Sequence, residues 1–146
     1  MSQIISVYLY VEAWMEFENI SRSSSMQDKQ TIVSLASMFF GAKLKGLCEQ
    51  AGYEYKGTIG PAGTLKRIEE YSPVAILLDL GKEDIDVKEM VAAIKTATDA
   101  PIIAFCGHVA TEQLEEARSC GCDVVTTNGA ITGSFESIIK TALEKS

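Results

Sequence analysis

Residues 74–80 read Val-Ala-Ile-Leu-Leu-Asp-Leu, an apolar run bracketed by Pro73 and Gly81 in which Asp79 is the only charged residue. A run of this length between turn residues is typical of a strand that is buried on both faces, as in parallel sheets covered by helices. Asp79 is then predicted to lie where the strand ends. In open α/β sheets, ligands bind beside that end of the strands.

The composition indicates one globular domain. The chain has 146 residues, of which 47% are hydrophobic and 23% charged, enough to bury a core without disulfides. Its net charge of -7 disfavours binding to nucleic acid or to an anionic membrane surface, because both select basic patches. No run approaches the ~20 apolar residues of a membrane span, and no basic stretch precedes the apolar residues 4–11. We therefore expect a cytoplasmic protein.

From residue 31 onward, strand and helix patterns alternate. Gly52 is placed to cap the first helix in a left-handed conformation, Pro61 to open the second, and Asp86 with Glu89 to cap the third. The predicted strands are residues 31–36, 54–59, 74–80, 101–106 and 123–126. Helices between strands imply a parallel, doubly wound sheet in three αβα layers. The length favours the five-stranded flavodoxin-like order 2-1-3-4-5 over a six-stranded dinucleotide-binding fold.

Residues 1–30 differ from the rest and are expected to form an N-terminal extension to a domain of residues 31–146. Residues 4–11 are rich in β-branched and aromatic side chains and predict a strand, and residues 12–20 predict a short amphipathic helix. A Ser-rich linker follows at residues 21–25. Two interpretations stay open: an accessory strand and helix that cover a sheet edge or a partner subunit, or a poorly ordered extension before an internal start at Met26.

The four cysteines are predicted to be structural thiols. They are Cys48, Cys106, Cys120 and Cys122. A chain with this core needs no disulfide, and the spacing of Cys120 and Cys122 gives half of a zinc site at most, with His108 as the only histidine. We expect no metal and no cofactor.

Four segments of the sequence resemble those of a known family. They are Ala-Gly-Tyr-Glu at 51–54, Pro-Val-Ala-Ile-Leu-Leu-Asp-Leu at 73–80, Ala-Pro-Ile-Ile-Ala-Phe at 100–105 and Gly-Cys-Asp-Val-Val at 121–125. In order and spacing they resemble the CheY-like receiver domains of two-component response regulators, over residues 31–145. The resemblance implies a signalling domain rather than an enzyme, and it places Asp79 at the position that receivers phosphorylate.

The partners that receivers place around this aspartate are missing. The resemblance implies an acidic Mg²⁺-binding pair after the first strand, where this chain has Leu35-Ala36-Ser37-Met38. The hydroxyl residue of the fourth strand falls on Cys106, a weak hydrogen-bond donor, and the lysine of the fifth falls on Thr127 or Asn128. The chain therefore resembles a degenerate receiver, or pseudo-receiver, that is not competent for conventional phosphorylation.

Three hypotheses of function follow. The first is a non-catalytic regulatory module that acts by protein association through a helical face or the N-terminal extension. The resemblance implies a homodimer through the last helix, the last strand and the helix before that strand. The second is a small-molecule binder or residual enzyme that uses the crevice at the strand ends, with Ser37, Asp79, Cys106, His108 and Asn128 as pocket candidates. No Gly-rich loop follows the first strand, which argues against a nucleotide or flavin there. The third is an atypical receiver that is phosphorylated at Asp79.

Overall fold

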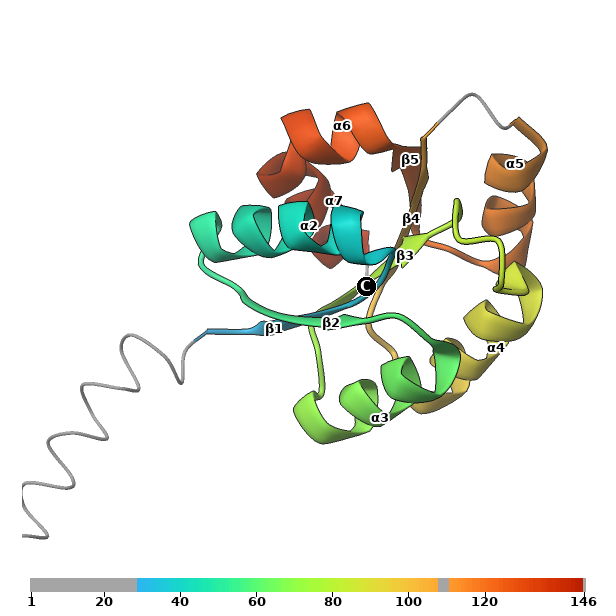
Figure 1. Ribbon diagram of the computed structural model, residues 1–146, viewed down its shortest axis with the longest axis horizontal. Coiled ribbons are helices and arrows are strands. Elements are labelled where there is room, and N and C mark those ends of the chain that lie inside the picture. The colour runs from blue at the N-terminus through green and yellow to red at the C-terminus, as the bar shows by residue number, and fades with distance from the viewer. Residues whose placement is uncertain (1–28, 108–110, 146) are drawn as a thin grey trace, which may run out of the picture. The chain divides into compact units, whose positions relative to one another are not determined.

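A computed structural model describes residues 29–107 and 111–145 (Figure 1). The strand and helix that we predicted in residues 4–20 lie outside the described residues. The strands are β1 (Thr31–Leu35), β2 (Glu54–Thr58), β3 (Ala75–Asp79), β4 (Ile102–Cys106) and β5 (Val124–Thr127). The helices are α2 (Met38–Gln50), α3 (Pro61–Tyr71), α4 (Val87–Ala97), α5 (Thr111–Cys120), α6 (Asn128–Gly133) and α7 (Phe135–Lys145).

The five strands form one parallel sheet in the order β2-β1-β3-β4-β5. The register places Leu35 of β1 opposite Leu78 of β3, and Asp79 opposite Phe105 of β4. All residues of β1, β3 and β4 are buried, as expected for strands that are covered on both faces. The predicted fold class and strand order are confirmed.

Each face of the sheet has its own hydrophobic core. On one face, side chains from alternate strand positions pack against α3, α4 and α5, through residues such as Ile68, Val91 and Ala117. On the other face they pack against α2, α6 and α7, through residues such as Leu44 and Ile139. Figure 1 shows the two sets of helices on opposite sides of the sheet. Because strand side chains alternate in direction, each strand contributes to both cores.

The helix ends follow local sequence signals, with one exception. The Ser37 side chain accepts a hydrogen bond from the Phe40 amide at 3.3 Å, and Asp86 accepts from the Glu89 amide at 3.1 Å. Gly52 has φ +88°, which is the left-handed conformation predicted for it. The exception is α6, which we did not predict because its sequence, Asn-Gly-Ala-Ile-Thr-Gly, is typical of a loop.

Gly57 of β2 lies against the Tyr55 ring, which leaves no room for a larger side chain at this position. A Cβ added at Gly57 would lie 2.7 Å from Cε1 and 2.9 Å from the hydroxyl of Tyr55. We expect Gly57→Ala to lower the free energy of unfolding by about 1–3 kcal/mol, because the Tyr55 ring must leave its packed position. Gly46→Ala is the matched control, because a Cβ at Gly46 of α2 meets nothing within 4 Å.

Gly46→Ala is expected to raise the free energy of unfolding by roughly 0.5–1 kcal/mol, because alanine favours the helix more than glycine does. Urea denaturation of both variants measures the two effects. Equal effects of the same sign would contradict the proposed contact between Gly57 and Tyr55.

Candidate functional site

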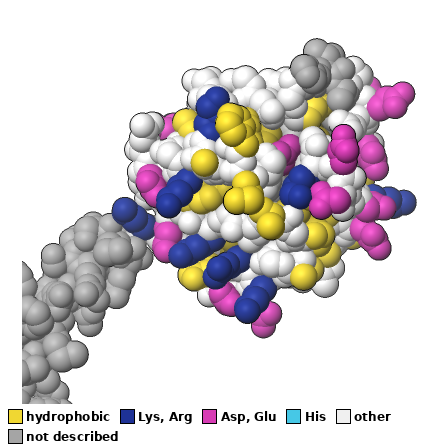
Figure 2. Space-filling view, in the orientation of Figure 1, with side chains coloured by type: hydrophobic (Ala, Val, Ile, Leu, Met, Phe, Trp, Pro, Cys, Tyr) yellow, Lys and Arg dark blue, Asp and Glu magenta, His cyan; other side chains and the backbone are white. Residues whose placement is uncertain are grey.

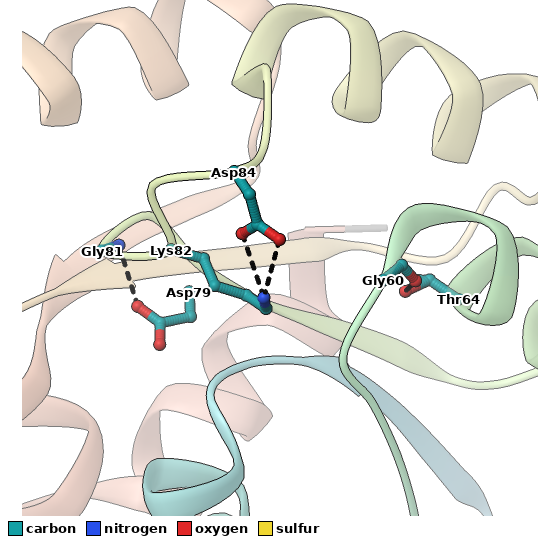
Figure 3. Close-up of polar contacts among 6 residues, drawn as sticks. All are labelled: Gly60, Thr64, Asp79, Gly81, Lys82 and Asp84. Carbon is teal, nitrogen blue, oxygen red and sulfur yellow. Dashed lines mark hydrogen bonds and ion pairs between the residues drawn. The ribbon is translucent and has the colours of Figure 1, made fainter.

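Asp79 is the last residue of β3 and lies at the end of the sheet where β1 and β4 also end. Asp79 is buried, with 8% of its surface exposed to solvent. One carboxylate oxygen, Oδ1, accepts a hydrogen bond of 2.9 Å from the Gly81 amide (Figure 3). A Cβ at Gly81 would lie 3.1 Å from that same oxygen, so the glycine allows the loop to turn closely around the carboxylate.

A hollow of about 680 Å³ opens beside Asp79. One wall is the start of α2, with Ser37, Phe39 and Phe40. The opposite walls are the loop after β3, the backbone at Gly107 after β4, and Asn128 after β5. The topology therefore brings Ser37, Asp79 and Asn128, three of the predicted pocket residues, to one hollow.

The loop after β3 adds an ion pair that the sequence analysis missed. Lys82 Nζ donates to Asp84 Oδ1 at 3.0 Å and to Oδ2 at 3.4 Å (Figure 3), and the Lys82 side chain is only 15% exposed. The hydrogen bond from Lys82 lowers the pKa of Asp84 below its ordinary value. The signal in the sequence was the charged stretch that follows Asp79, which also contains Glu83. Among the described residues, three carboxylates and one ammonium group thus line the hollow.

At the end of β5, Thr127 and Asn128 have different structural roles. Thr127 Oγ1 accepts a hydrogen bond of 3.1 Å from the Ala130 amide and so caps α6. Asn128 is the residue that lines the hollow, and its Oδ1 atom is buried without a hydrogen-bond partner. A Cβ at Gly107 would lie 3.0 Å from Asn128 Nδ2, so the amide packs directly against the end of β4. Of the two positions left open for the receiver lysine, Asn128 is the one at the hollow.

One predicted pocket residue, Cys106, is not brought to the hollow. Cys106 is 2% exposed and packs in the core beneath α3, α4 and α5, and it is not among the residues that line the hollow. His108 lies outside the described residues. A role for His108 at the site therefore stays a prediction.

The residues beside Asp79 offer few oxygen ligands for a cation. Ala36, which follows β1, is 2% exposed and apolar, and the hydroxyl of Ser37 is used to cap α2. Within residues 29–107 and 111–145, no three His, Cys, Asp or Glu side chains converge in a way that could hold a metal ion. A hard cation such as Mg²⁺ prefers several oxygen ligands in octahedral geometry. The nearest carboxylate pair in the loop, Glu83 and Asp84, includes one member already bound to Lys82.

The fold is that of receiver domains. The receiver domain of NtrC4 from Aquifex aeolicus has a TM-score of 0.68 and 23% identity, over 80% of this chain and 98% of that one. A receiver domain protein from Clostridium thermocellum has a TM-score of 0.69 and 17% identity, over 80% and 95%. NtrX from Brucella abortus, solved with ADP, has a TM-score of 0.72 and 16% identity. The match covers 80% of this chain and 27% of NtrX. No family model and no curated protein matches the sequence.

Proposed function

We propose that this domain is a receiver-like signalling module that acts through protein association and is not phosphorylated by the Mg²⁺-dependent route. The observation that carries the proposal is the set of side chains around Asp79. Where receivers have acids, a hydroxyl and a lysine, this chain has Ala36-Ser37, Cys106 and Asn128. The fold is retained while the groups that would serve phosphoryl transfer are not.

Charge in the hollow supports the same conclusion. A phosphoryl group on Asp79 would bring about -1.5 to -2 charges at neutral pH. Asp79, Glu83 and Asp84 already line the hollow, and the only ammonium group among its described lining residues, that of Lys82, is bound to Asp84. Without a divalent cation or a second lysine, the added charge would meet net repulsion in a partly buried site. Asn128 offers an amide dipole and no charge to offset it.

Exposed hydrophobic side chains support protein association. Among the described residues, the large hydrophobic side chains that are most exposed are Met38 at 78%, Phe39 at 88% and Ile59 at 60%. All three lie at the end of the sheet where Asp79 lies, on the start of α2 or just after β2. Clustered exposed apolar side chains are a mark of protein-binding surfaces. None of the described helices is long and apolar enough to span a bilayer.

The proposal is tested by amide NMR of the full chain with Mg²⁺ and beryllofluoride, which mimics a phosphoryl group on aspartate. We expect the spectrum to stay unchanged. Asp79→Asn is the matched control, because it keeps the size of the side chain and removes the charged acceptor. Chemical-shift changes around Asp79 that disappear in Asp79→Asn would contradict the proposal and favour an atypical phosphorylated receiver.

A second candidate function is the binding of a small molecule in the hollow. The observation that favours it is Asn128 Oδ1, a buried acceptor without a hydrogen-bond partner, because such atoms are normally satisfied in native proteins. A ligand with an N–H or O–H donor would satisfy it. A metabolite screen by thermal shift tests this, since a ligand specific for the folded state raises Tm. A true hit is expected to lose its effect in Asn128→Ala.

A further inference from the structure

β2 is an edge strand whose outer backbone groups can pair with another strand. Among the strands of residues 29–107 and 111–145, it has only β1 as a neighbour. The carbonyl of Thr58 faces β1, because it accepts a hydrogen bond of 3.3 Å from the Ala36 amide. Since backbone groups alternate along a strand, the N–H and C=O groups of Tyr55 and Gly57 face away from β1. An edge of this kind is a template for strand addition.

The side chains on either side of Tyr55 carry opposite charges. Glu54 and Lys56 form an ion pair of 3.1 Å within β2, and their side chains are 44% and 27% exposed. They point to one face of the sheet, because residues two apart on a strand share a face. The segment Glu-Tyr-Lys is therefore complementary in charge to a copy of itself that runs in the opposite direction.

We propose that the partner of this edge is a second copy of the chain, paired through β2 in antiparallel fashion with Tyr55 on the two-fold axis. In that register the outward N–H and C=O of Tyr55 exchange two hydrogen bonds with those of the partner's Tyr55. Glu54 then lies opposite the partner's Lys56, and Lys56 opposite the partner's Glu54. These are non-hydrogen-bonded positions, where facing side chains approach most closely. A two-fold interface is the commonest in homo-oligomers.

The charge pattern selects this register over its neighbours. Moving the axis to Gly57 would place Lys56 opposite Thr58 and leave Glu54 without a cationic partner. Moving it to Tyr53 would place Glu54 opposite Gly52, whose φ of +88° takes it out of the strand. Only the register centred on Tyr55 forms both ion pairs and uses the outward backbone groups.

Apolar surface beside the edge would be covered by the same pairing. A groove beside β2 is lined by residues of α2 and of the strand, among them Met38, Tyr55, Gly57 and Ile59. Figure 2 shows hydrophobic side chains gathered in the region of α2 and β2, with Lys and Arg side chains around them. Strand pairing brings the second copy to this groove, and so adds apolar contact to the two charge pairs.

Two charge reversals in the full chain test the proposal. Glu54→Lys gives β2 two lysines, and Lys56→Glu gives it two glutamates, so each variant repels its own copy. By sedimentation velocity, we expect the wild type to dimerise and each variant alone to dimerise roughly tenfold more weakly, because two attractive contacts become repulsive. An equimolar mixture of the two variants is expected to recover dimers, because their strands are then complementary.

The recovery on mixing shows whether a variant dimerises weakly because its interface is altered or because it has lost its fold. Both variants lack the ion pair within β2, so only contacts between chains can restore association. Glu69→Lys and Lys66→Glu on α3 are the matched controls, because they change the net charge equally at exposed positions outside β2. A wild type that stays monomeric, variants that dimerise like the wild type, or a mixture without recovery would each overturn the proposal.

Discussion

Replacing Phe105 by alanine is expected to lower the free energy of unfolding by about 3–5 kcal/mol. Phe105 lies on β4 and is fully buried. Its ring packs against that of Phe40 on α2, with the ring centres 5.2 Å apart and a tilt of 32° between the planes. The substitution removes a large apolar side chain, leaves a cavity between sheet and helix, and ends the aromatic contact. A domain of this size has roughly 5–15 kcal/mol of stability, so the loss is a large share of the total.

Phe39→Ala is the matched control for this prediction. Phe39 precedes Phe40 on the same helix but is 88% exposed, so its removal is expected to change the free energy of unfolding by less than about 0.5 kcal/mol. Urea denaturation followed by circular dichroism measures both variants. A similar loss in both would contradict the assignment of Phe105, and not Phe39, to the core.

Raising the pH above about 9 is expected to destabilise the protein through Cys48. Burial, with a smaller contribution from the charge of Glu49, raises the pKa of Cys48 from 9.0 to about 12. Below pH 9 the thiol keeps its proton in both states. Between pH 9 and 12 the unfolded chain releases this proton and the folded protein holds it. The free energy of unfolding should therefore fall by about 1.4 kcal/mol per pH unit in this window.

Cys122 adds to the same effect in a smaller amount. Its pKa is also raised to about 12, first by burial and then by the neighbouring Cys120 and Asp123, but it is partly exposed and its surroundings are better screened. Urea denaturation at pH 8 and 10 measures the combined slope. Cys48→Ala should be less dependent on pH than the wild type over this interval. An equal dependence in both would show that Cys48 is not the titrating group.

The sequence was sufficient for the fold because local and global signals agreed. The fully apolar run before Asp79 required a strand buried on both faces, and Gly52, Pro61 and Asp86 marked where helices end or begin. The helix α6 could not be predicted, since its stability comes from the Thr127 cap and from burial of Ile131 against the sheet. The cap is a local contact, and the burial of Ile131 is the tertiary contact that offsets the loop character of the sequence.

The site was only partly predictable. Strand ends in a parallel sheet lie together, so the sequence placed Ser37, Asp79 and Asn128 near one another. It could not show that Lys82 turns back to bind Asp84 beside them, because that depends on the path of the loop. Nor could it show that the Cys106 side chain packs in the core beneath α3, α4 and α5. The face of the sheet to which a strand side chain points is fixed only by the register of the strand. The phosphorylation state of Asp79 and the cytoplasmic location stay predictions.

Intact mass spectrometry after incubation with Mg²⁺ and a small phosphodonor such as acetyl phosphate tests the central claim most directly. A receiver that is known to accept phosphate from this donor, treated in parallel, shows that the reagent is active. We predict that the mass of this chain stays unchanged, because Asp79 lacks the acidic pair and the lysine that phosphoryl transfer requires. The mass increase of one phosphoryl group, present in the wild type and absent in Asp79→Asn, would contradict the account.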